Sequence, residues 1–189
     1  MQVFAYCAEA FRDSVMKAAG VTPVTSPPFT SDTFPPSLLM DNDLIVLTLH
    51  GQPGGYEWFG EADTGLPNWV PALGTKTLGA VNLGWAVVVA TSCHASKDAP
   101  MVRALLDAGA SCVIGGDGSN FSGRHAVTGA GLLTLWVRRG LKRGLSADAA
   151  LNLAKTRLAL EIARYTVAGD IANRLAVRDT MRFRVYRRK

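Results

Sequence analysis

Leu44-Ile45-Val46-Leu47-Thr48-Leu49-His50-Gly51 is the stretch on which the predicted fold rests, and Trp85-Ala86-Val87-Val88-Val89-Ala90-Thr91-Ser92-Cys93-His94 is its counterpart later in the chain. Each begins with a short apolar run bounded by Gly and polar residues, which is typical of a buried strand. Neither run alternates apolar with polar residues, so we expect both faces of each strand to be covered, as in a parallel α/β sheet. The sequence therefore predicts an α/β fold with a mostly parallel central sheet flanked by helices.

A reactive side chain follows each of these two strands: His50 the first and Cys93 the second. In open α/β sheets, ligands bind beyond the carboxyl ends of the strands. If the two strands are neighbours, His50 and Cys93 lie side by side at that place. We therefore expect the chemistry of this protein at the carboxyl ends of these two strands.

The remaining regular elements are predicted from apolar periodicity and from Gly, Pro and capping residues. We expect further strands over residues 2–6, 21–25, 111–115 and 181–186. We expect helices over residues 8–19, 125–139 and 146–169, and another that is capped by Asp98, has Pro100 in its first turn and ends at Gly109.

Two segments are predicted to be irregular. Residues 21–37 hold five prolines and are expected to form an extended loop. Residues 52–65 are expected to form a long loop above the site, because Pro53-Gly54-Gly55 breaks both helix and strand. A helical turn is expected within residues 68–73 or 74–80.

The composition fits one folded domain spanning residues 1–189 with a sizeable core, since 48% of the residues are hydrophobic and 19% are charged. No apolar run approaches the length of a membrane span, and the N-terminus lacks the basic and apolar regions of a signal peptide. Three cysteines, an odd count, make a disulfide scaffold improbable. We therefore expect a cytoplasmic protein that does not bind membranes.

The net charge of +5 is concentrated in two places: Arg138 to Arg143, and a basic tail over about residues 181–189. Such a tail can bind nucleic acid or anionic partners. However, no aromatic platform is interleaved with it and no zinc-finger spacing accompanies it. We interpret the tail as a solubilising end and do not expect nucleic-acid binding.

His50 and Cys93 together fit nucleophilic catalysis. A cysteine becomes a strong nucleophile when it ionises, and a neighbouring base or imidazolium favours that. Amide hydrolysis also needs donors for the developing oxyanion, which the backbone N–H groups of Gly51 and Cys93 can supply. Ser92 and Ala95 are small and leave room for a substrate backbone. These residues predict a His50/Cys93 dyad.

The other cysteines and histidines carry weaker signals. Cys7 and Cys112 lie at or inside strand patterns with no histidine after them, so we interpret both as core residues. We expect His94 to contact substrate or solvent and His125 to lie near a helix cap or on the surface. A metal site made by Cys93 with these two histidines has no supporting ligand spacing, so neither metal nor cofactor is expected.

The strand that ends in His-Gly, followed by a strand that ends in a small residue and Cys, resembles the caspase-like (clan CD) cysteine peptidases. Thr91-Ser92-Cys93-His94-Ala95-Ser96 is similar to the metacaspase pattern Asp-Ser-Cys-His-Ser-Gly. Downstream, Ala108-Gly109-Ala110, a strand, a loop and two predicted helices look like a CHAT domain, the helices containing Gly140-Leu141 and Gly144-Leu145-Ser146-Ala147-Asp148-Ala149-Ala150. The resemblance covers roughly residues 40–160 and implies a caspase-like three-layer sandwich.

By position, the resemblance makes His50 the general base or acid, Cys93 the nucleophile and Gly51 an oxyanion donor. It implies an endopeptidase that cleaves protein or peptide substrates through a thioester acyl-enzyme, and it leaves room for a regulatory protein partner. The sequence departs from metacaspases at Thr91, where they place the aspartate that binds a basic side chain next to the cleaved bond. An acid for that role would have to come from Asp117 or Glu9.

Two other functions remain open. In class I glutamine-amidotransferase-like hydrolases, the cysteine lies in a Gly-x-Cys-x-Gly elbow and the histidine follows it. Here Thr91 and Ala95 occupy the glycine positions, and His50 precedes Cys93. The other alternative is a non-catalytic caspase-like scaffold or sensor, although the presence of both dyad residues argues against it.

Overall fold

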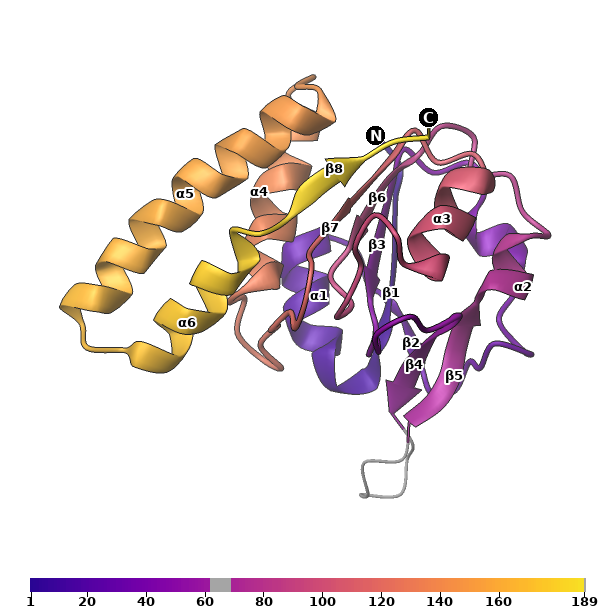
Figure 1. The fold of residues 1–189 in the computed structure, drawn as a ribbon, viewed down its shortest axis with the longest axis horizontal. Helices are drawn as coiled ribbons and strands as arrows, with labels where there is room; N and C mark the ends of the chain where they lie inside the picture. Colours follow the sequence, from indigo (N-terminus) through magenta and orange to yellow (C-terminus); the bar gives the residue numbers. More distant parts are fainter. Residues whose placement is uncertain (62–68, 189) are drawn as a thin grey trace.

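A computed structural model describes residues 1–61 and 69–188 and has a six-stranded sheet at its centre (Figure 1). The strand order is β2-β1-β3-β6-β7-β8. These strands span Val3–Ala8 (β1), Val24–Ser26 (β2), Leu44–Thr48 (β3), Val87–Ala90 (β6), Cys112–Gly115 (β7) and Arg184–Tyr186 (β8). Neighbouring strands are parallel except for β8, which pairs antiparallel with β7 at the edge. The predicted mostly parallel α/β sheet is therefore confirmed.

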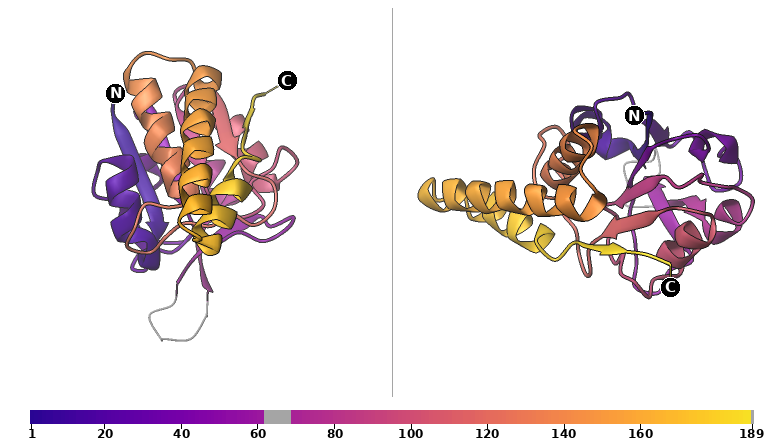
Figure 2. Two further views of the ribbon diagram at one scale, coloured as in Figure 1. Left: turned by 90° about the vertical axis from the view of Figure 1, so that its left-hand side faces the viewer. Right: turned by 90° about the horizontal axis from the view of Figure 1, so that it is seen from above.

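Helices cover both faces of the sheet (Figures 1 and 2). One face packs against α2 (Thr75–Leu78) and α3 (Pro100–Asp107), and the other against α1 (Arg12–Ala19), α4 (Ala130–Lys142), α5 (Ala147–Val167) and α6 (Ile171–Thr180). Short 3-10 helices, η1 (Glu9–Phe11) and η2 (Pro36–Leu39), follow β1 and precede β3. This arrangement is compatible with the predicted three-layer sandwich.

The two faces explain why the predicted strands show no alternation of polar and apolar residues. Every residue of β3 is buried. Ile45 and Leu47 pack into the core on the α2–α3 side, whereas Leu44 and Val46 pack into the core on the α1–α4–α5 side. Since successive side chains of a strand point to opposite faces, a sheet covered on both sides needs apolar residues at every position.

The predicted loop over residues 52–65 is wrong in its second half. Glu57–Glu61 form a strand, β4, that pairs antiparallel with β5 over Trp69–Gly74. Pro53-Gly54-Gly55 makes a turn before the strand rather than breaking it, and the Gly55 N–H donates to the carbonyl of Gln52 at 3.2 Å. Residues 62–65 of the predicted loop lie outside the described residues. The helical turn expected within residues 68–73 or 74–80 is confirmed in the second range, as α2, whereas residues 69–73 belong to β5.

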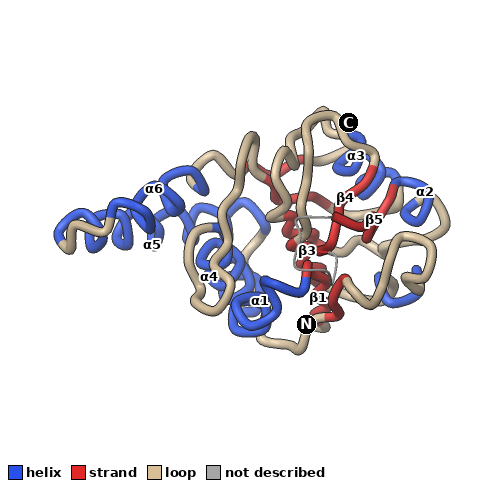
Figure 3. The backbone as a smooth tube through the Cα atoms, turned by 90° about the horizontal axis from the view of Figure 1, so that it is seen from below, coloured by secondary structure: helices blue, strands red, loops and turns tan. Residues whose placement is uncertain are grey.

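The hairpin formed by β4 and β5 lies beside the carboxyl ends of β1 and β3 (Figure 3). Gly60 makes this docking possible. A Cβ atom at Gly60 would lie 2.1 Å from the Ser26 hydroxyl oxygen and 2.6 Å from the Ser26 carbonyl oxygen. Any larger residue would therefore push the hairpin away from β2.

Two further differences from the sequence-based expectations concern helix boundaries. The cap of α3 is Ala99, not Asp98, whose carboxylate instead accepts a hydrogen bond from Arg103 at 3.0 Å. His125 precedes α4 instead of beginning it, because that helix starts after Gly129.

At the C-terminal end, α5 is capped by Ser146 as predicted. Helix α6 was not predicted. It is capped by Asp170, which accepts a hydrogen bond from the Asn173 N–H at 3.1 Å, and it returns along α5 (Figure 2). Among the described helices, none has both the length and the apolar character needed to cross a lipid bilayer.

Gly60→Ala is expected to destabilise the protein by about 1–3 kcal/mol, because the added methyl group overlaps the main chain of Ser26. Gly79→Ala is the matched control, since Gly79 has a helical φ of -64° and its nearest atoms would lie 3.4 Å from a new Cβ. Urea denaturation of both variants measures the difference. Equal free energies of unfolding for the two variants would show that the hairpin does not depend on this contact.

Candidate active site at the carboxyl ends of β3 and β6

The carboxyl ends of β3 and β6 lie side by side, as the sequence predicted. The strands pair in register from Leu44 with Val87 to Leu47 with Ala90. Beyond them, the Leu49 N–H donates to the Ser92 hydroxyl at 3.2 Å. The residues that follow the two strands therefore lie next to each other at the same edge of the sheet.

At Gly51, the segment that follows β3 comes into direct main-chain contact with the segment that follows β6. A Cβ atom at Gly51 would lie 2.2 Å from the Cys93 carbonyl oxygen and 3.2 Å from the Cys93 nitrogen. Only a residue without a side chain fits there. The contact places the His50-Gly51 segment against Cys93, which is the juxtaposition expected from the sequence.

The imidazole of His50 is held by the hairpin. His50 and Phe59 exchange two backbone hydrogen bonds, each 2.8 Å long. The ring stacks on the indole of Trp69, with centroids 4.9 Å apart and planes inclined by 4°, and Phe11 lies 5.4 Å away on another element. These contacts fix both the backbone and the ring of His50.

Glu61 is the charged partner of His50. Its Oε1 atom lies 3.3 Å from His50 Nε2, and its Oε2 accepts a hydrogen bond from the Ala10 N–H at 3.1 Å. The carboxylate is thus held from two sides, by η1 and by the imidazole. A proton on Nε2 donates to Glu61 and leaves Nδ1 as the basic nitrogen of the ring.

Cys93 is half-buried, and its sulfur contacts the loop that follows β7. The Asn120 N–H donates to Sγ at 3.3 Å, and the thiol donates to the Asn120 carbonyl at 3.6 Å. The Asn120 side-chain amide also donates to the Ser92 carbonyl at 2.8 Å. Within the described residues no hydrogen bond joins Sγ to His50, so each member of the predicted dyad has a different partner.

The backbone amides predicted to stabilise an oxyanion are both unused. Neither the Gly51 N–H nor the Cys93 N–H donates a hydrogen bond to another residue in the part of the chain that the structure describes. The close packing of Gly51 on Cys93 places them in one region. Two backbone donors at such a place can bind an oxygen atom that gains negative charge.

The residues predicted to contact substrate differ from one another in burial and in the contacts they make. Ser92 is fully buried and its hydroxyl is used by Leu49. His94 is half-buried, with a φ of 57°, and its N–H donates to the Gly118 carbonyl at 2.7 Å. Asp117 is exposed on the same loop, whereas Glu9 is exposed at the start of η1, 3.9 Å from Arg12.

Thr91 is buried where β6 meets β3. Its hydroxyl donates to the Thr48 hydroxyl at 2.8 Å and lies 3.3 Å from the Leu47 carbonyl oxygen. In this position it ties β6 to β3, and it makes no contact with a charged group in the described residues.

Sequence reasoning missed Glu61, Trp69 and Asn120. Glu61 and Trp69 were missed because residues 52–65 were expected to form a loop and residues 68–73 a helical turn. The residues of β4 alternate in burial, with Trp58 and Gly60 more buried than Glu57, Phe59 and Glu61. The sequence Glu-Trp-Phe-Gly-Glu does not show this alternation, because Trp58 and Phe59 are adjacent apolar residues. Asn120 contacts the Cys93 sulfur through its backbone, for which the sequence carries no signal.

Comparison with known proteins adds no family assignment: no protein-family model matches the sequence, and no curated protein matches it. Among the described residues, no group of three or more His, Cys, Asp or Glu side chains is placed to hold a metal ion. His125, one of the residues considered for such a site, lies at the surface, with Nδ1 3.2 Å from an oxygen of Asp13.

The two other cysteines have the character of core residues. Cys7 is fully buried, and burial raises the pKa of its thiol to about 12. Burial also raises the pKa of Cys112. Since the thiolate is the reactive form, neither residue is suited to act as a nucleophile.

Iodoacetamide at neutral pH is expected to modify the native protein once, at Cys93, because Cys7 and Cys112 are buried and stay protonated. Mass spectrometry of the digested protein locates the label. Cys93→Ala should take up none until urea unfolds the protein, when the two buried thiols should both react. Labelling of Cys7 or Cys112 in the folded state would contradict this description of the core.

Proposed function

We propose that this protein is a cysteine endopeptidase with a caspase-like fold, in which Cys93 is the nucleophile, His50 the general base and acid, and Glu61 the residue that positions His50. The observation that carries the proposal is the contact of Glu61 with His50 Nε2 at the same place where Gly51 packs against Cys93. A carboxylate in contact with an imidazole, and a cysteine on the adjoining segment, are the parts that thiol-based acyl transfer needs.

In the proposed reaction, His50 Nδ1 accepts the Cys93 proton, and the sulfur attacks the carbonyl carbon of the scissile amide. The carbonyl oxygen becomes an oxyanion that the N–H groups of Gly51 and Cys93 stabilise. The carbon–nitrogen bond then breaks, and the departing amine takes the proton from His50. A thioester remains on Cys93. Water attacks it, gives a proton to His50 and releases a carboxylate, and the thiol regains its proton.

Glu61 supports this cycle electrostatically. The imidazole becomes positively charged after it accepts the thiol proton, and a carboxylate 3.3 Å from its other nitrogen stabilises that charge. The same contact fixes which nitrogen carries the proton in the neutral ring. Both effects favour proton exchange with Cys93.

The proposal requires Cys93 to exchange its contact with Asn120 for one with His50. The two hydrogen bonds between Cys93 and Asn120 involve sulfur and are long, at 3.3 and 3.6 Å. A single hydrogen bond contributes about 1 kcal/mol net, so substrate binding can displace these contacts. Such a displacement would release the thiol as the substrate carbonyl arrives.

The backbone around Cys93 does not favour the amidotransferase-like alternative. A nucleophile elbow is a sharp, strained turn between a strand and a helix. Among the described residues with positive φ, His94 is found and Cys93 is not. In addition, α3 begins only at Pro100. The non-catalytic scaffold is the second candidate function, and the observation that favours it is the cover that Asn120 provides over the sulfur.

Cleavage of a fluorogenic peptide library with every residue varied next to the scissile bond tests the proposal. We expect turnover by the native protein and at least a thousandfold loss in Cys93→Ala and in His50→Ala, since each removes a reacting group. Circular dichroism verifies that the variants remain folded. Undiminished cleavage by folded Cys93→Ala would refute the mechanism, and the absence of any turnover would favour the scaffold.

Glu61→Gln is expected to lower kcat about tenfold or more, with a smaller effect on KM, because the neutral amide keeps the shape but loses the charge that stabilises the imidazolium. Asp13→Asn is the matched control: it removes a carboxylate that contacts another histidine, His125, at the surface. An unchanged kcat in Glu61→Gln, or a loss that falls on KM alone, would exclude the positioning role.

A further inference from the structure

Helices α4 and α5 lie side by side at the surface and carry a group of cations that the proposed chemistry does not use (Figure 2). We call this group the basic face. The connection between α4 and α5 lies at the end of the molecule where the N-terminus is, whereas the hairpin beside the candidate active site lies at the opposite end (Figure 1). The basic face is therefore separate from the reacting groups. Four of its residues belong to α4 or to its C-terminal cap and one to α5: Arg138, Arg139, Lys142, Arg143 and Arg157.

Two guanidinium groups of the basic face are held by one aromatic ring. The guanidinium carbon of Arg139 lies 4.7 Å from the centre of the Trp136 ring, and that of Arg157 lies 4.9 Å from it. Trp136 is half-buried and packs against the core on this side of the sheet, so packing fixes its position. A guanidinium that packs on a ring keeps its donors free for an anion, and little further freedom is lost when it binds one. Arg139 and Arg157 are therefore oriented before a ligand arrives.

No acidic side chain neutralises the basic face within the described residues. None of its cations takes part in an ion pair there. Helix α4 contains neither Asp nor Glu. Both acids of α5 are already paired with other arginines, Asp148 with Arg187 and Glu161 with Arg164. The basic face therefore presents uncompensated positive charge to solvent, which attracts anionic ligands.

Arg138 extends this charge to the C-terminal end of α1. A Cβ atom at Gly20, the residue that caps α1, would lie 2.2 Å from Arg138 Nη1, so the guanidinium packs against that helix end. Its Nε is buried and has no hydrogen-bond partner among the described residues. Burial and, to a lesser extent, the neighbouring charge of Arg139 lower the pKa of Arg138. An anion bound beside Arg139 would relieve the repulsion between the two cations.

A double-stranded nucleic acid presents anions in an arrangement that suits this face. It carries one phosphate charge per about 1.7 Å of its axis on a stiff rod, so several phosphates can reach neighbouring cations at once. An acidic peptide would first have to be ordered, which costs binding free energy. Single strands gain affinity by stacking their bases on aromatic rings, but Trp136 already packs against two guanidinium groups. The observations therefore favour a duplex.

We propose that the basic face binds double-stranded nucleic acid through its phosphates, without reading the bases. Arg139, Lys142 and Arg143 follow one another at helical spacings of three and four residues, so they share one side of α4, and Arg157 joins them from α5. The sequence-based expectation against nucleic-acid binding concerned a different segment, the basic tail over about residues 181–189. No residue of the basic face belongs to the proposed catalytic machinery, so the inference stands whether or not the protein cleaves peptides.

Fluorescence anisotropy of a short labelled DNA duplex, titrated with the intact protein at several salt concentrations, tests the proposal. We expect a dissociation constant of about 10⁻⁴ to 10⁻⁶ M at physiological salt. The logarithm of the affinity should fall with the logarithm of the salt concentration by about 0.9 for each phosphate contacted, which gives a slope of about −3 to −4 for contacts by Arg139, Lys142, Arg143 and Arg157. An affinity that does not depend on salt, or no binding even at low salt, would overturn the inference. So would equally tight binding, at equal charge, of polyglutamate or of vesicles that contain phosphatidylserine.

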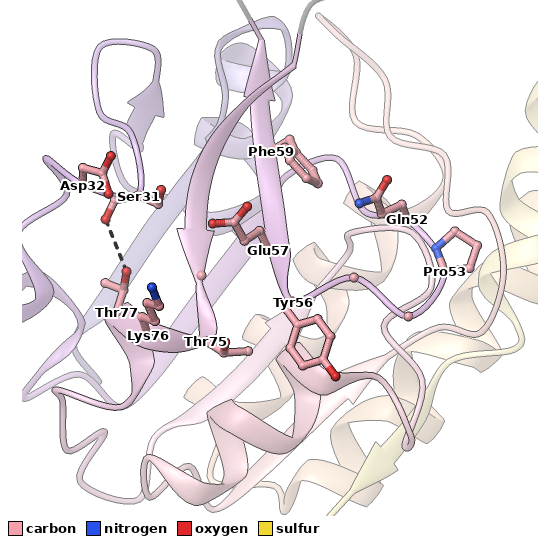
Figure 4. Close-up of a pocket in the computed structure, with 13 residues that line it drawn as sticks. Ser31, Asp32, Gln52, Pro53, Tyr56, Glu57, Phe59, Thr75, Lys76 and Thr77 are labelled. Atoms are coloured by element: carbon pink, nitrogen blue, oxygen red, sulfur yellow. Dashed lines mark hydrogen bonds between the residues drawn. The ribbon is translucent and has the colours of Figure 1, made fainter.

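Single substitutions test whether the contacts belong to the basic face. Arg139→Gln and Arg157→Gln should each make the salt dependence shallower by about one, since each removes one phosphate contact. Lys76→Gln is the matched control, because it also removes one exposed positive charge, from a cavity between the hairpin and α2 (Figure 4). Helix α2 covers the other face of the sheet, so this change should leave the salt dependence as it is. Equal effects of Arg157→Gln and Lys76→Gln would show that only the net charge matters and would overturn the inference.

A variant that combines Lys142→Gln and Arg143→Gln repeats the test without touching the packing of Trp136. Both side chains are exposed at the end of α4, so we expect the variant to fold, which circular dichroism verifies. Its salt dependence should become shallower by about two. An unchanged salt dependence in this folded variant would overturn the inference, whatever the result for Arg139 and Arg157.

Discussion

The close approach of Gly51 to the main chain of Cys93 is the constraint on which the candidate site depends. It follows from the parallel register of β3 and β6, which ends both strands at the same level, and from the absence of a side chain at Gly51. A βαβ connection alone would bring two strand ends near each other. The missing Cβ allows main-chain contact and places in one region two N–H donors that donate to no other described residue.

The hairpin of β4 and β5 supplies the contacts that orient the His50 side chain. The sheet positions Cys93 and the backbone of His50, but the imidazole is fixed by Trp69, through stacking, and by Glu61, through its carboxylate. The hairpin in turn packs against β2 at Gly60. The central sheet therefore carries the nucleophile, whereas a two-stranded hairpin packed against it orients the proposed base.

The sequence was sufficient for the central sheet because burial on both faces demands uninterrupted apolar runs, and such runs are easy to recognise in β3, β6 and β7. It also located His50, Gly51 and Cys93, since those residues directly follow the runs. It was insufficient for the hairpin. Glu57 to Glu61 do not alternate polar with apolar residues, Pro71 lies inside β5, and Gly-rich flanks are equally typical of loops. Because the hairpin was not predicted, Glu61 was not recognised as the partner of His50. The contact of Asn120 with Cys93 depends on the path of a loop that no periodic pattern encodes.

Glu61 has two oxygens and two partners, the imidazole of His50 and the backbone of Ala10. One carboxylate therefore joins three segments that are distant in the sequence: the hairpin, η1 and the segment after β3. A displacement of η1 at the surface would move the carboxylate that holds the imidazole, so the orientation of the proposed base depends on a part of the chain that carries no reacting group.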